Sequence, residues 1–145
     1  MDLIRGYLVV LLLLFPSFAA GAAAMDPMDS YQWKNRVLLM FASPDDPELT
    51  NQRDTLSRHE AELADRDMVV FAVVGDDQIV PLYGDAPPAA QAARLREQFE
   101  VSSGDGFTAL LVGKDGGVKW RKNRPAIPQE LFGLIDAMPM RRNER

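Results

Sequence analysis

The chain has 145 residues, of which 47% are hydrophobic and 26% charged, and its formal net charge is −5. This balance is typical of one globular domain and excludes a disordered or collagen-like chain. The complete absence of cysteine excludes disulfides, thiolate metal sites and thiol redox chemistry through the chain's own residues. A single histidine and the net negative charge argue against histidine-rich metal sites and nucleic acid, so we predict no cofactor, no metal and no nucleic-acid partner.

Residues 1–24 have the pattern of a secretory signal peptide, in which Arg5 precedes an apolar run from Tyr7 to Phe15 and an alanine-rich stretch follows. The apolar run is shorter than the roughly 18 residues that a membrane-spanning helix requires. We therefore predict a periplasmic or secreted protein, cleaved near Ala22 or Ala24. The alternative is an uncleaved anchor, and only then do we expect association with the membrane.

A polar arm with scattered aromatic residues, 25–35, leads into the first predicted strand, 37–42. That run is apolar at every residue, as is a second one at 68–74, which is typical of strands buried on both faces of a sheet. Since a helix is predicted between them, we expect the two strands to be parallel neighbours.

The first predicted helix begins with a capping signal, because Asp46 can accept hydrogen bonds from free N–H groups and Pro47 suits the first helical position. We expect this helix to reach about Asp65. Its predicted buried side consists of Leu49, Leu56 and Leu63.

Residues 78–88 contain three prolines and a glycine, which predict a loop with at most one short edge strand, and a second helix is expected at 89–100. The runs 107–112 and 118–121 flank Asp115-Gly116, a strong signal for a hairpin. In its second strand we expect Val118 and Trp120 to point inward and the intervening cations outward.

The last predicted helix starts at Pro128 and ends before Met138-Pro139, and the tail, 141–145, is predicted to be solvated. The domain proper is thus assigned to 36–140. The order β-α-β-α-β-β-α predicts an α/β, thioredoxin-like fold: a mixed four-stranded sheet of order 2-1-3-4 with helices on both faces.

Four stretches carry a resemblance to a known family: VLLMFASPDDPELTNQ (37–52), ADRDMVVFAVVGD (64–76), GFTALLVGKDGGVKWR (106–121) and ELFGLIDAMPMRRNE (130–144). The chain resembles an exported bacterial thioredoxin-like and peroxiredoxin-like family of unknown function. That family is related to the domain in sushi-repeat-containing proteins and in a coiled-coil-domain-containing matrix protein. The resemblance implies a fold and export more than a chemistry.

Thiol redox activity does not follow from this resemblance. Thioredoxins carry reactive cysteines directly after the first core strand, where this chain has Ser43-Pro44-Asp45-Asp46. They also place a proline before the third core strand, where this chain has Phe107-Thr108.

Two groups of residues are candidates for binding. Ser43, Asp45, Asp46 and Thr108 are expected at one edge of the sheet, as an acid/base pair or cation site, or, for the acids, as simple helix capping. His59 is more than about 15 Å along the helix from Ser43, too far to activate it.

Lys119 and Arg121 belong to a local basic patch with three neighbouring cations, which either docks an anionic surface or is a solvated edge strand. No catalytic residue is assigned. We predict a non-catalytic binding or accessory module for an unknown protein or small molecule in the cell envelope. The alternative is an enzyme of non-thiol chemistry that uses the acidic start of the first helix.

Overall fold

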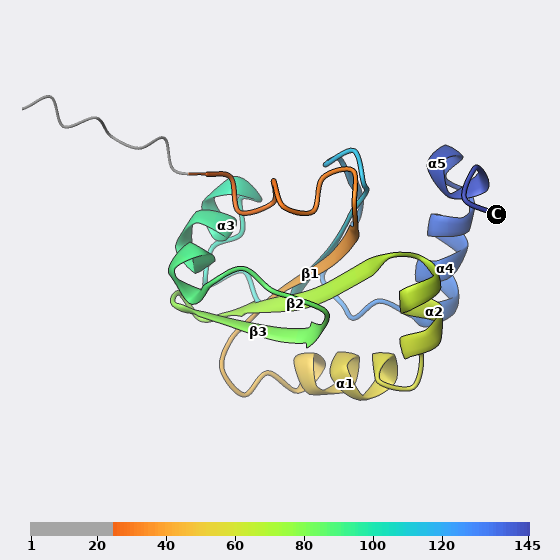
Figure 1. Cartoon of the computed structure of the whole chain (residues 1–145). Coiled ribbons are helices and arrows are strands. Elements are labelled where there is room, and N and C mark those ends of the chain that lie inside the picture. The colour runs from red at the N-terminus through yellow and green to blue at the C-terminus, as the bar shows by residue number, and fades with distance from the viewer. Residues whose placement is uncertain (1–24) are drawn as a thin grey trace, which may run out of the picture.

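The computed structural model describes residues 25–145, so the predicted signal peptide lies outside the described residues. Figure 1 shows a central sheet with helices packed on it. In chain order the elements are β1 (Arg36–Ala42), α1 (Pro47–Leu56), α2 (Glu60–Asp65), β2 (Met68–Val74), β3 (Gln78–Tyr83), η1 (Ala89–Gln91), α3 (Ala92–Gln98), β4 (Thr108–Val112), β5 (Val118–Lys122), α4 (Pro128–Asp136) and α5 (Pro139–Arg142).

The sheet has five strands in the order β3-β2-β1-β4-β5 and is mixed, since β1 and β2 are parallel and every other pair is antiparallel. The predicted parallel pairing of the first two strands is confirmed. The predicted count of four strands is wrong, because residues 78–83 form β3. Pro81 is tolerated there because β3 is an edge strand, on which one row of backbone N–H groups has no strand partner.

The helix predicted to run from Pro47 to about Asp65 is two helices, α1 and α2. The chain turns between them, where the Ser57 hydroxyl donates to the Asp54 carbonyl at 2.8 Å. Such a local side-chain bond competes with continuation of a helix. The predicted buried leucines nevertheless all face the sheet, because the break keeps both helices on the same face.

The helices cover both faces of the sheet (Figure 1). Leucines of α1, α2 and α4 pack on one face, and α3 packs on the other together with the N-terminal arm. Tyr31 anchors this arm: its ring stacks on Phe71 with centroids 5.9 Å apart, and its hydroxyl donates to the Asp85 carbonyl at 2.6 Å. Burial, followed by the nearby Asp85 carboxylate, raises the pKa of Tyr31 to about 12. The arm is therefore an integral layer of the domain.

The hairpin of β4 and β5 differs from the prediction at one residue. Trp120 packs against the core as expected, but Val118 is 49% exposed. A β-bulge shifts the register between Leu111 and Val112, so that Val118 faces solvent.

Gln52 ties α1 to the loop before α4. It is completely buried, and its amide donates to the Ala126 carbonyl at 3.0 Å while its oxygen accepts from the Ala126 N–H at 2.6 Å. Because the loop carries no secondary structure of its own, this pair of bonds satisfies buried backbone groups that would otherwise lack partners.

The N-terminus of α1 is capped as predicted, since the Asp46 carboxylate accepts from the Glu48 N–H at 2.9 Å. Replacing Asp46 by alanine is expected to lower the free energy of unfolding by about 1 kcal/mol, because the N–H loses its acceptor. Urea unfolding monitored by tryptophan fluorescence measures this. Asp46→Asn, which keeps an accepting oxygen, is the matched control and should cost much less; equal losses would contradict the capping role.

Candidate ligand-binding site

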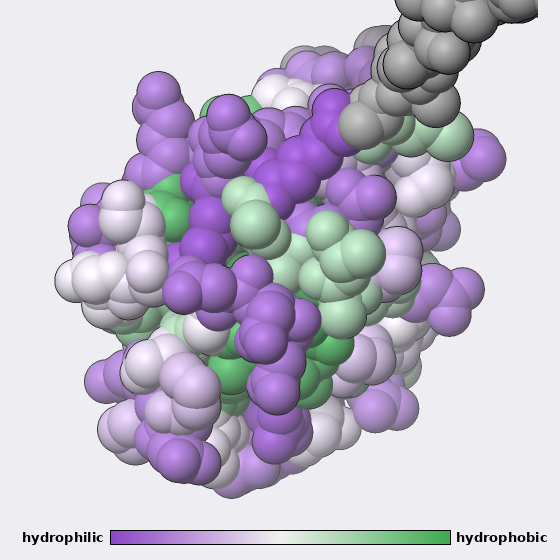
Figure 2. Space-filling view, turned by 90° about the vertical axis from the view of Figure 1, so that its left-hand side faces the viewer, coloured by the Kyte–Doolittle hydropathy of each residue, from purple (hydrophilic) through white to green (hydrophobic). Residues whose placement is uncertain are grey.

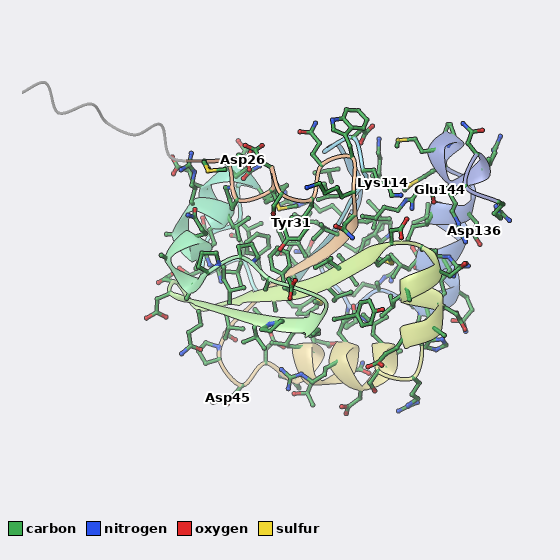
Figure 3. All side chains as sticks on the ribbon, in the orientation of Figure 1. Asp26, Tyr31, Asp45, Lys114, Asp136 and Glu144 are labelled. Atoms are coloured by element: carbon green, nitrogen blue, oxygen red, sulfur yellow. The ribbon has the colours of Figure 1, made fainter. Side chains whose placement is uncertain are left out.

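The predicted binding residues lie at opposite ends of the sheet. Ser43, Asp45 and Asp46 follow the carboxyl end of β1, and Thr108 pairs with Phe41 at that same end. Lys119 lies at the other end, in the hairpin beyond Val112. Figure 3 shows the separation, with Asp45 far from Lys114 and Glu144.

The acidic end does not bring its polar groups together. Asp46 caps α1, Ser43 and Asp45 are exposed, and the Asp45 backbone is left-handed with φ 62°. Thr108 is 1% exposed, and its hydroxyl accepts from the Asn123 side chain at 3.3 Å. These polar side chains therefore do not converge on one point. The arrangement gives little basis for concerted acid/base chemistry.

A polar groove lies at this end, beside α3, with a volume of about 430 Å³. Buried Arg96 is part of its wall, but its guanidinium donates to the carbonyls of Gly75 at 2.7 Å and Val101 at 3.4 Å. The other charged wall residues are Asp76, Glu97 and Glu100. Figure 2 shows this end of the molecule as mostly hydrophilic, with small apolar patches between polar side chains.

The two predicted cations of β5 have different surroundings. Arg121 donates to the Phe99 carbonyl at 2.9 Å and so ties β5 to the end of α3. Lys119 pairs with Asp115 at 2.7 Å and lines a cavity of about 340 Å³. Of the predicted site residues, Lys119 is therefore the one that faces this cavity.

This hairpin cavity lies between the turn of the β4–β5 hairpin and the junction of α4 and α5. Its volume falls within the range of small-molecule sites. One part of its wall is apolar and comes from the helices: Leu134, Ala137, Met138, Pro139 and Met140. The other part comes from the strands and their turn: Arg36, Gly113, Lys114, Asp115 and Lys119.

Two nearly buried cations of the hairpin cavity bind the same carboxylate. Arg36, 1% exposed, donates to both carboxylate oxygens of Glu144 at 3.2 Å, and it also donates to the Arg66 carbonyl at 3.0 Å. Lys114 donates to Glu144 at 2.6 Å and to Asp67 at 2.8 Å. Figure 3 shows Lys114 and Glu144 side by side near α5.

These contacts shift the protonation equilibria of the groups that make them. Burial alone would raise the pKa of Glu144, but the bonds from Lys114 and Arg36 outweigh it and lower this pKa to about 2. Burial alone would lower the pKa of Lys114, and its bonds to Asp67 and Glu144 raise it instead. Glu144 and Lys114 are therefore both charged near neutral pH.

A second ionic cluster holds α4 and α5 in place. Asp136 accepts from Arg66 at 2.9 and 3.1 Å and from Arg141 at 3.3 Å. Arg141 is buried and also binds Asp65. Residues 142–145 of the predicted solvated tail are exposed, but Arg141 is buried, and Arg141 and Glu144 pair with Asp65 and Arg36, far away in the sequence.

Sequence reasoning missed Arg36, Lys114 as a buried group, and Glu144. One signal was present: Arg36 directly precedes a run of six apolar residues, and a cation at the start of a buried strand requires a counter-charge. Nothing local identifies Glu144 as that counter-charge.

Within residues 25–145, no three His, Cys, Asp or Glu side chains are grouped as a metal site would require. Across the same residues, none of the helices has the length and apolar character needed to cross a bilayer.

The fold and the cavity define a mixed α/β domain with an ionic, apolar-walled site. Its sequence matches the family described as Domain of unknown function (DUF4174) over residues 27–144, and the chain belongs to this family. It is also similar to coiled-coil domain-containing protein 80 from Danio rerio, with 29% identity over 134 residues that cover 81% of this chain. The match spans 15% of that relative's length. No solved structure matches the chain.

Proposed function

We propose that this chain is an exported, non-catalytic binding module with a thioredoxin-like fold, and that the hairpin cavity holds its ligand. The order β2-β1-β4-β5 within the sheet, with helices on both faces, is the arrangement expected of such a fold. The resemblance to an exported bacterial family and the signal pattern of residues 1–24 support a location in the periplasm or outside the cell.

One observation carries the proposal: an apolar wall and three cations face each other across one cavity of about 340 Å³. Binding sites commonly combine a mostly apolar lining with a few polar groups that fix orientation. The polar groove beside α3 lacks this combination, since its wall mixes acids with an arginine already bound to backbone carbonyls.

The enzyme alternative, which uses the acidic start of the first helix, has less support. Asp46 caps α1, and Thr108 is buried with its hydroxyl bound by the Asn123 side chain. A ligand held at the opposite end of the sheet is therefore the function that the geometry favours.

Native mass spectrometry of the protein purified gently from the cell envelope tests this proposal, because it detects bound small molecules and bound proteins alike. Ala137→Trp places a large side chain at the wall of the hairpin cavity and is expected to abolish the bound species. Ala64→Trp makes the same replacement at an exposed residue of α2 and should retain it. Loss of the bound species with Asp45→Asn/Asp46→Asn but not with Ala137→Trp would favour the enzyme alternative.

A further inference from the structure

We propose that the hairpin cavity recognises a carboxylate attached to an apolar group. This inference rests on the proposed function and adds a chemical class of ligand to it. Three observations carry it: a carboxylate already bound by the cavity's cations, an excess of cations over acids among the lining residues, and an apolar wall beside them.

Glu144 shows that the cavity's cations can hold a carboxylate. Arg36 approaches its two oxygens in the fork geometry typical of arginine–carboxylate pairs, and Lys114 adds a third charged bond. The geometry is therefore already suited to a planar anion.

The same cations have donor capacity left over. Lysine has three N–H donors, and Lys114 uses two of them on Asp67 and Glu144. Lys119 is paired only with Asp115 at the surface, where such a pair contributes little and is easily exchanged. Because three of the residues that line the cavity are cations and one, Asp115, is an acid, an incoming anion is favoured over a cation.

The apolar wall indicates that the part of the ligand beyond its carboxylate is apolar. Leu134 and Met140 are exposed although they line the cavity, so apolar surface there remains in contact with water. Covering it with a hydrocarbon group removes this surface from water and so favours binding. Methionine side chains adapt readily to ligands of different shape.

Glu144 is then an internal competitor of the ligand. It follows α5, a helix of four residues that also supplies part of the apolar wall. A bound carboxylate either takes the place of Glu144 or lies beside its negative charge. In each case neutralising Glu144 while keeping its size should strengthen binding.

Isothermal titration calorimetry with decanoate, below its micelle concentration, tests the inference. We expect decanoate to bind and decylamine, which has the same chain with a cationic head, not to bind. Lys114→Met is expected to weaken decanoate binding about tenfold, since a charged hydrogen bond is lost. Lys119→Gln should weaken it about threefold, and Glu144→Gln should strengthen it about threefold. Lys122→Gln, at an exposed cation of β5 outside the cavity, is the matched control and should change nothing.

The source of the carboxylate is distinguished by a second arm, a short peptide ending in leucine compared with the same peptide amidated. Binding of decanoate indicates a free fatty acid, and binding of only the free-acid peptide indicates a chain terminus; either result supports the shared chemistry. The inference is overturned if neither binds, or if decylamine binds as well as decanoate. Should Lys114→Met fail to fold, the opposite shifts expected for Lys119→Gln and Glu144→Gln decide the question.

Failure of this inference is separable from failure of the proposed function. If carboxylates do not bind while Ala137→Trp still abolishes the naturally bound species, the ligand class is wrong and the binding site stands.

Discussion

Replacing Gln52 by methionine is expected to lower the free energy of unfolding by about 2–5 kcal/mol. Methionine keeps most of the side-chain volume but cannot replace either amide bond to Ala126. Gln52 is 0% exposed and Ala126 is also buried. The N–H and carbonyl of Ala126 would therefore lose their hydrogen-bond partners without becoming accessible to water. Each unsatisfied buried group costs about 1–3 kcal/mol.

Urea unfolding measured by circular dichroism and by tryptophan fluorescence gives this free energy for Gln52→Met. The matched control is Gln129→Met, the same replacement at an exposed residue of α4, which should change stability by less than about 0.5 kcal/mol. Similar losses for the two variants would show that Gln52 does not hold the loop before α4 in the way described.

Replacing Glu144 by alanine is expected to cost about 3 kcal/mol or more, because it leaves Arg36 buried with no carboxylate partner. Removing one partner of a buried ion pair is typically far more costly than removing an exposed pair. The side chain of Glu144 is itself partly exposed, so most of the loss comes from Arg36 and not from the glutamate. Glu97→Ala, at an exposed glutamate of α3, is the control and should have a small effect.

The pH dependence of stability provides an independent measurement on the same residue. The pKa of Glu144 is about 2 in the folded protein, against an ordinary value of 4.5. A carboxyl group whose pKa is lowered by folding stabilises the protein fully above its unfolded pKa, and this stability is lost as the pH falls toward the folded value. We expect wild type to lose stability between about pH 5 and pH 2. In the background of Glu144→Gln this loss should be smaller, and an unchanged slope would contradict the role of Glu144.

The features predicted correctly from the sequence are those encoded locally. Runs of apolar residues identify β1, β2 and β4 because burial on both faces leaves no polar position. The adjacent residues Asp46 and Pro47 mark the start of a helix. The Asp115-Gly116 turn joins β4 to β5 as predicted. In each case neighbouring residues contain all the necessary information.

The features that were missed depend on contacts between distant residues. The prolines of 78–88 left open whether a short edge strand forms, and the pairing of β3 with β2 decides this at the sheet edge. The bulge that turns Val118 outward is set by the register against β4. Gln52 looks like an ordinary polar helix residue until Ala126, 74 positions later, is placed beside it.

The candidate site was predicted even less completely than the fold. Lys119 was identified from a local basic patch, which gives no indication that a cavity adjoins it. The apolar wall at Met138–Met140 was predicted only as the end of a helix. The contacts of Glu144 with Arg36 and Lys114 form only when β1, the hairpin and α5 are in place. No spacing in the sequence therefore predicts them.

The pairing of Arg36 with Glu144 has a consequence for the order in which the protein matures. It joins residues 108 positions apart, near the two ends of the domain. A polypeptide emerges from its N-terminus first, so β1 is available for pairing long before its arginine can be neutralised by Glu144. The last step of folding must therefore await the arrival of the C-terminal turn. Until then the nascent chain carries an uncompensated charge at the start of its central strand, which keeps that end hydrated and the domain incompletely folded.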